Sequence, residues 1–258
     1  MMAAFSSSVF DLTGRTALVT GARRGIGLAV ASALAEAGAD IVAVSRTADH
    51  FQLEAAVTAA GRSFTSYACD LADRTATERL GAELTRDGAT PIDVFFGNAG
   101  AFRRRPALEQ SDDDWDEVLE VNLSAQFLLA RALGEGMLDR AHGRILFTAS
   151  MLSFQGGLNV VGYAAAKSGL SGLTKALSNE WSGRGVTVNA IAPGYIDTAV
   201  TEGLIADPVR SRQILERIPI GRWGRPADIA GAAVFLASDA AAYVTGTVLP
   251  VDGGWLGR

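Results

Sequence analysis

Short apolar segments alternate with longer segments of helical periodicity along almost the whole of this chain. Several apolar segments are nearly continuous, which is typical of parallel strands that are covered on both faces. The predicted strands are Thr16–Thr20, Ile41–Ser45, Phe64–Cys69, Ile92–Phe96, Arg144–Ala149, Thr187–Ile191 and Val244–Val251. The predicted helices are Ile26–Ala37, Arg74–Arg86, Trp115–Arg140, Tyr163–Trp181 and Ala227–Ser238. The alternation predicts an α/β fold, with a Rossmann-like, doubly wound, seven-stranded and mostly parallel sheet and helices on both faces.

No linker, repeat or low-complexity tract divides the 258 residues, so we expect a single domain over 1–258. The acidic run Asp112–Asp114 follows Ser111 and precedes an apolar segment. Acidic side chains in a first helical turn interact favourably with the positive end of the helix dipole, so this run predicts a helix N-terminus.

Composition excludes several classes of protein. A formal net charge of −5 argues against a nucleic-acid-binding face, which is usually basic. The single cysteine, Cys69, cannot form an internal disulfide and is expected to be a buried thiol, while His50 and His142 stand far apart, so we expect no metal site. Met1–Phe10 lacks the basic and apolar regions of a secretory signal, and no apolar run is long enough to span a membrane. These features favour a soluble, cytoplasmic protein.

A glycine-rich turn joins the first predicted strand to the first predicted helix. Glycines allow positive φ angles and let a pyrophosphate approach the backbone closely, while the helix N-terminus offers unpaired N–H groups. The position between first strand and first helix makes this motif specific for a dinucleotide. The cofactor-binding candidates in the turn are Gly21, Arg23, Arg24, Gly25, Ile26 and Gly27.

The end of the second strand predicts which dinucleotide binds. A carboxylate there would accept a bond from the ribose 2′-OH, whereas an arginine accommodates a 2′-phosphate. Here Ser45 and Arg46 end the strand, and Arg23 and Arg24 add positive charge nearby. We therefore expect NADP(H) to be favoured over NAD(H); the alternative is that Arg46 is a solvated loop residue.

Tyr163 and Lys167 are four residues apart on a predicted helix, with Ser150 thirteen residues before Tyr163. Only two of the 23 basic residues are lysines, Lys167 and Lys175. The i,i+4 spacing places the ammonium on the same helix face as the phenol, where a cation would lower the pKa of the tyrosine. Ser150 could then hold a substrate oxygen against the phenol. Taken alone, the pair could equally be an exposed Tyr–Lys pair on a helix surface.

These motifs, in this order, resemble the short-chain dehydrogenase/reductase family over nearly the whole chain. The matching residues are the Thr20–Gly27 turn, Asp70-Leu71, Asn98-Ala99-Gly100, Asn122, the Ser150, Tyr163 and Lys167 trio, Pro193-Gly194 with Thr198, and Val251-Asp252-Gly253-Gly254. One departure is Gly97, where the family usually has the first Asn of Asn-Asn-Ala-Gly.

The resemblance implies a role for each matching residue. Asp70 would bond the adenine amino group, Leu71 would give a backbone contact, and Asn98, Ala99 and Gly100 would line the adenosine ribose. Asn122 would hold a water that joins Lys167 to solvent, Pro193 and Gly194 would form the nicotinamide-side loop, and Ile196 and Thr198 would contact the carboxamide. Ser150, Tyr163, Lys167 and Asn122 would be catalytic, with Tyr163 and Lys167 also at the cofactor. The family likeness further implies a homotetramer.

Other stretches are similar to a narrower group of sugar-acid dehydrogenases that act on 2-deoxy- or 2-keto-3-deoxy-gluconate. The substrate candidates are Ser150 and Tyr163 with Arg103, Arg104, Gln155 and Trp223, the last in a substrate loop at about 195–226. A sugar acid carries a carboxylate, which an arginine fork can bind through two bonds. The arginines could instead be a solvated or interface cluster, and Trp223 could serve packing.

Three functions are therefore open. The first is an NAD(P)-dependent oxidoreductase that interconverts a secondary alcohol and a ketone on a sugar acid or polyol. The second is a reductase of another carbonyl class, such as 3-oxoacyl thioesters or small ketones. The third is a dinucleotide-sensing regulator without turnover, against which the intact Ser–Tyr–Lys trio argues.

Overall fold

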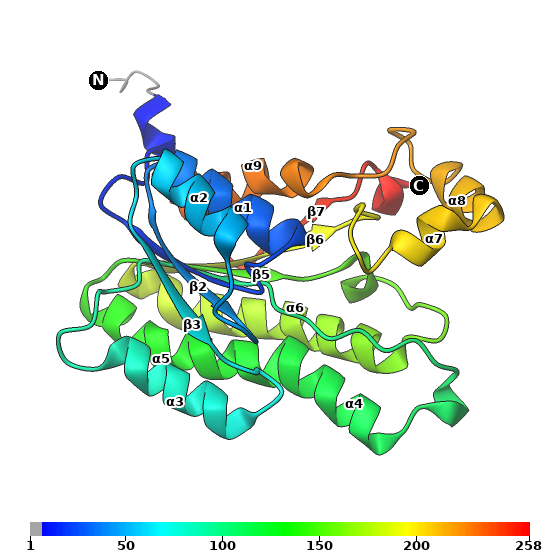
Figure 1. The fold of residues 1–258 in the computed structure, drawn as a ribbon, viewed down its shortest axis with the longest axis horizontal. Coiled ribbons are helices and arrows are strands. Elements are labelled where there is room, and N and C mark those ends of the chain that lie inside the picture. Colours follow the sequence, from blue (N-terminus) through cyan, green and yellow to red (C-terminus); the bar gives the residue numbers. More distant parts are fainter. Residues whose placement is uncertain (1–6) are drawn as a thin grey trace.

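One parallel sheet runs through the protein in the computed structural model, which describes residues 7–258 (Figure 1). Within these residues the sheet has seven strands in the order β3-β2-β1-β4-β5-β6-β7, and every neighbouring pair is parallel. The strands are β1 Thr16–Thr20, β2 Asp40–Ser45, β3 Phe64–Ala68, β4 Val94–Gly97, β5 Gly143–Thr148, β6 Val186–Pro193 and β7 Val248–Val251. Residues 1–6 of the opening segment lie outside the described residues.

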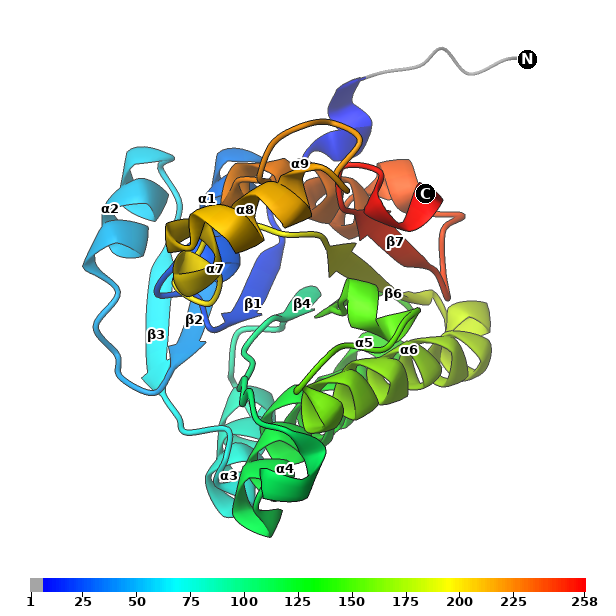
Figure 2. The ribbon, with the colours of Figure 1, turned by 90° about the vertical axis from the view of Figure 1, so that its right-hand side faces the viewer.

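Helices cover both faces of this sheet, so the predicted doubly wound fold is confirmed (Figure 1). One layer contains α1 Gly25–Glu36, α2 Phe51–Ala59 and α9 Pro226–Ala237; the other contains α3 Arg74–Thr85, α4 Asp112–Leu119, α5 Ala125–Asp139 and α6 Val161–Trp181. The short helices α7 Glu202–Ala206 and α8 Pro208–Leu215 lie at the end of the molecule where the chain also ends (Figures 1 and 2).

The two layers bury two separate cores because side chains alternate across each strand. In β1, Leu18 packs into the core under α3, α5 and α6, whereas Ala17 and Val19 pack into the core under α1 and α9. All five residues of β1 are buried, as the nearly continuous apolar segment predicted.

The strand order reverses between β1 and β4, which are neighbours in the sheet. From β1 the next strands in the chain, β2 and β3, are added on one side, and from β4 the strands β5, β6 and β7 are added on the other. In open parallel sheets, ligands bind at the carboxyl ends of the strands beside such a reversal. The turn after β1 and the loops after β4 and β5 therefore lie where a cofactor is expected.

The helix predicted over Trp115–Arg140 is interrupted in the structure. It begins earlier, at Asp112, because the Ser111 hydroxyl accepts a bond from the Asp114 N–H at 3.1 Å, and the acidic run lies in its first turn as predicted. A π-helical turn, Glu120–Ser124, then separates α4 from α5. Such turns are often found at functional sites, and Asn122 lies inside this one.

Other differences have local causes. The strand predicted from Val244 begins only at Val248, because Gly246 adopts a positive φ of 74° and Asn189 donates a side-chain bond to the Val244 carbonyl at 2.8 Å. The helices α2, α7 and α8 were not predicted; α2 buries only Leu53 and Val57 and so has a weak hydrophobic pattern.

Cys69 is buried, as expected, and burial raises the pKa of its thiol.

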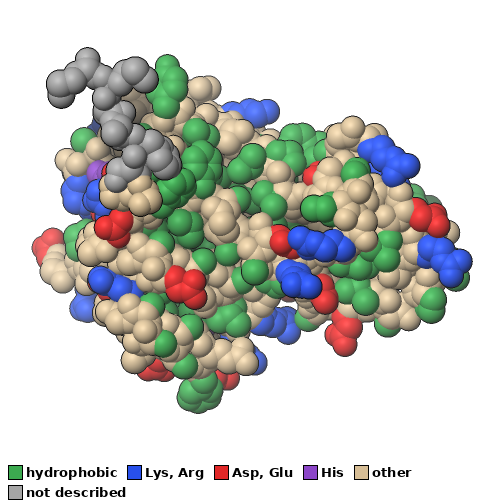
Figure 3. All heavy atoms as spheres, turned by 90° about the horizontal axis from the view of Figure 1, so that it is seen from above, with side chains coloured by type: hydrophobic (Ala, Val, Ile, Leu, Met, Phe, Trp, Pro, Cys, Tyr) green, Lys and Arg blue, Asp and Glu red, His purple; other side chains and the backbone are tan. Residues whose placement is uncertain are grey.

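On the face seen from the α1–α9 side, basic and acidic side chains are interspersed (Figure 3). Among the described residues, no helix has the length and apolarity needed to cross a membrane. Within the same residues, no group of three or more His, Cys, Asp or Glu side chains could hold a metal ion.

Candidate active site at the carboxyl edge of the sheet

The turn after β1 has the shape of a phosphate-binding cradle. Gly21 and Gly25 have φ angles of +67° and +57°, which side chains other than glycine rarely adopt. A Cβ on Gly27 would lie 2.2 Å from the Gly21 carbonyl oxygen, so the helix can begin this close to the turn only with glycine there. Arg24 is the N-cap residue of α1, and its side chain makes no capping hydrogen bond. The Arg24 side chain therefore does not occupy the first N–H groups of the helix. These residues fit the pyrophosphate of a dinucleotide.

Polar and basic side chains lie together where β2 ends. The Ser45 hydroxyl is 3.0 Å from Nε2 of the buried His50, and Arg23 donates to the Thr47 hydroxyl at 3.1 Å. Arg46 is exposed beside them. Arg23 and Arg46 therefore place positive charge at the same strand end, as the sequence predicted, whereas His50 was not singled out as a site residue.

Asp70 and Leu71 follow β3 and differ in exposure. The Asp70 carboxylate is exposed and accepts the Ala72 N–H at 3.1 Å, while Leu71 is buried in the core. Cys69 donates its backbone N–H to the Ser45 carbonyl at 2.8 Å, so this loop lies next to the end of β2. The two predicted adenosine-side segments are thus neighbours.

Asn98 joins the ends of three strands. Its side-chain NH₂ donates to the Thr20 carbonyl at 3.0 Å, and its side-chain oxygen accepts the Thr148 hydroxyl at 3.2 Å. The Thr20 hydroxyl accepts the backbone N–H groups of Asn98 and Ala99 at 2.9 and 3.0 Å. The loop after β4 is therefore fixed directly against the glycine turn, as a residue lining a bound ribose would require.

The structure brings Ser150, Tyr163 and Lys167 together at the end of β5. Ser150 follows the strand, and its hydroxyl accepts the Leu152 N–H at 3.1 Å. Nζ of Lys167 donates to the Thr148 carbonyl at 2.6 Å and lies 5.5 Å from the centre of the Tyr163 ring. The edge of Phe102 packs against this ring, with 5.0 Å between centroids. Phe102 was not predicted, since nothing in its sequence context marks it.

Burial dominates the acidity of both titratable groups. It raises the pKa of Tyr163 to about 12, with the neighbouring Ser150 side chain acting in the opposite direction. Burial also lowers the pKa of Lys167 to about 7. The expectation that Lys167 would lower the pKa of Tyr163 is therefore wrong for this structure. The cause is that the amine lies over the ring and donates to a backbone carbonyl, while desolvation disfavours both charged forms.

Asn122 is fully buried in the π-helical turn. Its side-chain NH₂ donates to the Ala101 carbonyl at 2.7 Å and to the Val118 carbonyl at 2.9 Å. Its side-chain oxygen has no hydrogen-bond partner within residues 7–258. A buried, unpartnered acceptor is compatible with the predicted water, which stays a prediction. One helical turn later, Gln126 makes a parallel set of contacts that the sequence analysis missed.

The loop after β6 reaches back to the glycine turn. Pro193 ends the strand, and Gly194 allows close approach to β7, since a Cβ there would lie 2.6 Å from Cα of Asp252. Ile196 is buried, and the Thr198 methyl lies 3.5 Å from the position of a Cβ on Gly25. The loop that follows Pro193 thus lies beside the cradle, and its predicted role at the nicotinamide stays a prediction.

The predicted substrate residues differ in what they contact. Arg103 does not form a free fork, because its guanidinium is ion-paired with Glu117 and, at 3.3 Å, with Asp114 of α4. Arg104 is exposed, and no ion pair holds it among the described residues. Gln155 is half-buried in the loop that leads to α6.

Trp223 belongs to an aromatic cluster under α8. Its indole N–H points to the Ser211 hydroxyl at 3.3 Å, and its ring packs edge-on against Tyr195 at 5.6 Å. Tyr195 in turn contacts the buried Trp255 at 4.8 Å. These contacts agree with the alternative prediction, in which Trp223 serves packing, better than with direct substrate contact.

The C-terminal turn holds the segment after α8. Arg217 lies over the Trp255 ring at 3.9 Å, and Arg258 donates to the Glu216 carbonyl at 2.7 Å. Trp255 packs with Met151, which follows Ser150 in the chain. The chain's last residues therefore connect the region of α7 and α8 to the loop that carries Ser150.

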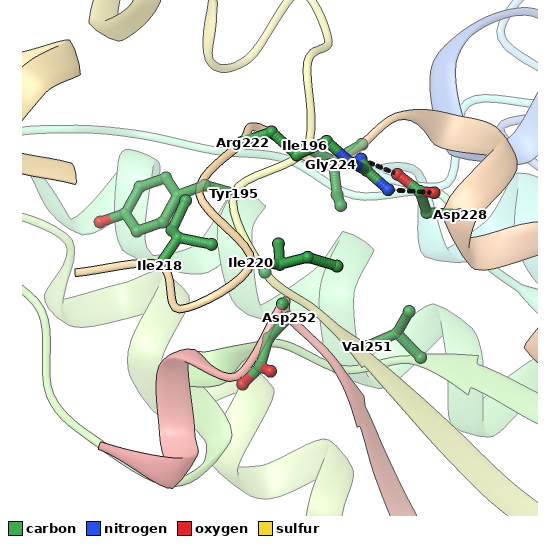
Figure 4. Close-up of a pocket in the computed structure, with 11 residues that line it drawn as sticks. Tyr195, Ile196, Ile218, Ile220, Arg222, Gly224, Asp228, Val251 and Asp252 are labelled. Carbon is green, nitrogen blue, oxygen red and sulfur yellow. Dashed lines mark hydrogen bonds and ion pairs between the residues drawn. The ribbon is translucent and has the colours of Figure 1, made fainter. Parts of the chain in front are cut away.

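A cavity of about 240 Å³ is lined by residues of the loop after β6, among them Tyr195 and Ile196 (Figure 4). Its walls are mainly aliphatic, and the Arg222–Asp228 ion pair lies at one side of it, with contacts of 2.6 and 2.9 Å. The lining residues are Gly194, Tyr195, Ile196, Ile218, Ile220, Arg222, Gly224, Asp228, Val251, Asp252 and Gly253.

Known proteins match both the sequence and this geometry. The family model described as Enoyl-(Acyl carrier protein) reductase matches residues 21–256. A 2-dehydro-3-deoxy-D-gluconate 5-dehydrogenase from Pseudoalteromonas atlantica is 54% identical over 251 residues, which are 96% of this chain and 98% of the relative.

Solved structures agree in fold over nearly the whole length. A structure described as an NAD(P)-dependent gluconate 5-dehydrogenase from Beutenbergia cavernae, with NADP bound at low occupancy, has a TM-score of 0.93 and 51% identity and covers 96% of this chain and 99% of that one. A gluconate 5-dehydrogenase from Burkholderia cenocepacia in complex with NADP and tartrate has a TM-score of 0.91 and 36% identity, with 97% and 98% covered. The predicted family is therefore confirmed: the chain belongs to the short-chain dehydrogenase/reductase family of oxidoreductases.

Proposed function

We propose that the protein interconverts a secondary alcohol and a ketone on a sugar acid of the gluconate type, with NADP(H) as the favoured cofactor. The observation that carries the proposal is the meeting of Ser150, Tyr163 and Lys167 beside the glycine cradle. The gluconate-type names of the similar proteins support the substrate class, and the NADP bound in similar structures supports the cofactor.

Ser150 is suited to hold the reacting oxygen. Its hydroxyl oxygen already accepts the Leu152 N–H at 3.1 Å, which leaves its own proton to donate. In the reducing direction, charge develops on the substrate oxygen, and a fixed donor stabilises that charge. The glycine turn Gly21–Gly27 would hold the dinucleotide, which would supply hydride chemistry to the substrate carbon in either direction.

Tyr163 transfers the proton to or from the same oxygen. Its ring is fixed between Phe102 and the Lys167 amine, so the phenol keeps one orientation. Lys167 donates one N–H to the Thr148 carbonyl, and its remaining N–H groups can donate to the cofactor ribose, the role that the family resemblance implies. An ordinary tyrosine is already protonated near neutral pH, and burial raises the pKa of Tyr163 further, so the phenol is in the form that can donate.

Recognition of a sugar acid is assigned to exposed groups around this trio. Arg104 can pair with the substrate carboxylate, since Arg103 is already engaged with α4. Gln155 can bond substrate hydroxyl groups. We further propose that residues 1–258 act as one dinucleotide-binding domain, whose segment at about 195–226 covers the substrate. A homotetramer and a cytoplasmic location stay predictions.

The preference for NADP(H) is proposed from charge. Arg46 is exposed at the end of β2, Arg23 is held beside it by Thr47 at 3.1 Å, and no carboxylate occupies position 45. A 2′-phosphate placed there would meet two guanidinium groups, whereas a 2′-OH would gain much less.

A substrate panel tests the proposed reaction. Purified protein is mixed with NADPH or NADP and, separately, with NADH or NAD, and absorbance is followed with gluconate derivatives, 3-oxoacyl thioesters and small ketones. We expect turnover with the gluconate-type compounds. Turnover confined to thioesters or ketones would reject the sugar-acid assignment, and no turnover with any compound would favour the regulator.

Tyr163→Phe tests the proton transfer. Removing the hydroxyl should lower kcat/KM by about 100- to 10,000-fold, since general acid catalysis contributes that much. NADPH affinity, measured by fluorescence titration, should change little. Tyr243→Phe is the matched control, because Tyr243 is fully exposed and should keep full activity. Full turnover of the Tyr163 variant would rule out its assigned role.

Lys167→Met tests the buried amine through stability. Burial lowers the pKa of Lys167 to about 7 in the folded protein, below its ordinary value of 10.5. Between these values the unfolded chain holds one more proton, so folding releases it and stability rises with pH. The free energy of unfolding of wild type minus that of Lys167→Met should rise by up to about 1.4 kcal/mol per pH unit in this window.

Urea unfolding from neutral pH to about pH 10 measures this difference. This pH range lies above the ordinary pKa of histidine and below that of tyrosine, so neither group titrates strongly within it. Lys175→Met is the control, because Lys175 is exposed and its removal should give a flat difference. If the difference for Lys167→Met also did not change with pH, burial would not disfavour the charged ammonium of Lys167.

Arg46→Asp tests the cofactor preference. The new carboxylate should repel a 2′-phosphate and accept a bond from a 2′-OH, so the ratio of NADPH to NADH affinity should fall about tenfold or more. Arg86→Asp, the same charge change at an exposed position after α3, is the control. An unchanged ratio in Arg46→Asp would show that this side chain does not select the cofactor.

A further inference from the structure

The loop after β4 is held from two sides. On one side, the Thr20 hydroxyl binds the N–H groups of Asn98 and Ala99. On the other side, two buried side-chain amides bind its carbonyls: Gln126 donates to Ala99 at 3.3 Å, and Asn122 donates to Ala101 at 2.7 Å. Neither the contacts of the Thr20 hydroxyl nor those of the two amides were predicted from the sequence.

The spacings of the two partners match. Asn122 and Gln126 are four residues apart on a helix and so share a face, while Ala99 and Ala101 are two apart in a loop. Each amide also satisfies a carbonyl of its own helix, Val118 at 2.9 Å for Asn122 and Val121 at 2.9 Å for Gln126. The second bond spans five residues, so Gln126 supports the π-helical turn Glu120–Ser124 that contains Asn122.

Two glycines make room for these amides. A Cβ on Gly97 would lie 2.4 Å from the side-chain oxygen of Gln126, and a Cβ on Gly100 would lie 2.8 Å from that of Asn122. Both oxygens are buried without a hydrogen-bond partner in the described part of the chain. Gly97, the position that departs from the family pattern, is thus where the Gln126 carboxamide fills the space beside the strand.

We propose that Gln126 is a positioning residue of the cofactor site, acting together with Gly97. Its carboxamide fixes the Ala99–Ala101 loop against the π-helical turn, and so sets both the backbone assigned to the adenosine ribose and the orientation of Asn122. This inference rests on the proposed function for the identity of the cofactor, but the contacts of Gln126 with the loop and with Gly97 do not depend on any substrate.

Gln126→Met removes the donor and keeps the side-chain length. We expect NADPH to bind about fivefold or more weakly at 25 °C, because losing the bond to the Ala99 carbonyl frees the loop and losing the bond to Val121 loosens the π-helical turn. Thr174→Val is the matched control: it removes a buried side-chain bond of 2.8 Å to the Leu170 carbonyl in α6, away from the loop. It should lower the melting temperature and leave NADPH affinity within about twofold. A folded Gln126→Met protein with wild-type affinity would overturn the proposal.

Gln126→Glu tests the donor in a second way. A carboxyl buried beside two carbonyl oxygens has a raised pKa and, once protonated, can donate its single O–H to one of them, where the amide donates to both. The NADPH affinity lost relative to wild type should therefore be recovered in part as the pH falls from about 8.5 to about 6. A loss that stays constant over this range would mean that the donor has no positioning role.

A double-mutant cycle tests the fit with Gly97 without any ligand. Gly97→Ala should lower the melting temperature strongly in wild type and clearly less in Gln126→Ala, because the added Cβ then meets no carboxamide. Equal effects in both backgrounds would overturn the pairing. Failure of wild type to bind NADPH would instead reject the proposed cofactor, and a silent substrate panel with normal NADPH binding would reject only the proposed reaction.

Discussion

A line of hydrogen bonds across the ends of three strands connects the cofactor cradle to the lysine. It runs from the Thr20 carbonyl to the Asn98 side chain, on to the Thr148 hydroxyl, and from the Thr148 carbonyl to Nζ of Lys167, with distances of 3.0, 3.2 and 2.6 Å. Because Thr20, Asn98 and Thr148 end or follow three strands of one parallel sheet, the register of the sheet fixes the spacing between the cradle and the carbonyl that holds Lys167. The remaining loops are arranged around this line.

Burial sets the chemical character of the trio more strongly than the charge of its members. Lys167 is buried and Tyr163 half-buried beside it, and desolvation drives each group towards its neutral form. Their hydrogen bonds are correspondingly valuable, since an unpaired polar group in such surroundings costs about 1–3 kcal/mol. This accounts for the use of backbone carbonyls and of Ser150, rather than opposite charges, as the partners of Lys167 and Tyr163.

The sequence predicted the parts of the site that depend on local pattern. The glycine turn, the strand ends and the Tyr163–Lys167 spacing each follow from rules that act within a few residues, and they lie where expected. What could not be predicted depends on contacts between distant segments. Arg103 pairs with α4, and Gln126 reaches Gly97 across the helix–sheet interface. A buried glutamine on an apolar helix face, beside an unexpected glycine, was the available signal for the second contact.

The C-terminal turn has a practical consequence. Trp255 and Arg258 are structural neighbours of Arg217 and Glu216, so the carboxyl end of the chain is built into the support of the segment that follows α8. Arg258 itself is exposed, but a purification handle fused to it would begin directly beside its bond to the Glu216 carbonyl and three residues after the buried Trp255. The described chain starts at Ser7, which lies well away from α7 and α8 (Figure 1), so the amino-terminal side is the better attachment point for tags, surface immobilisation or reporter fusions.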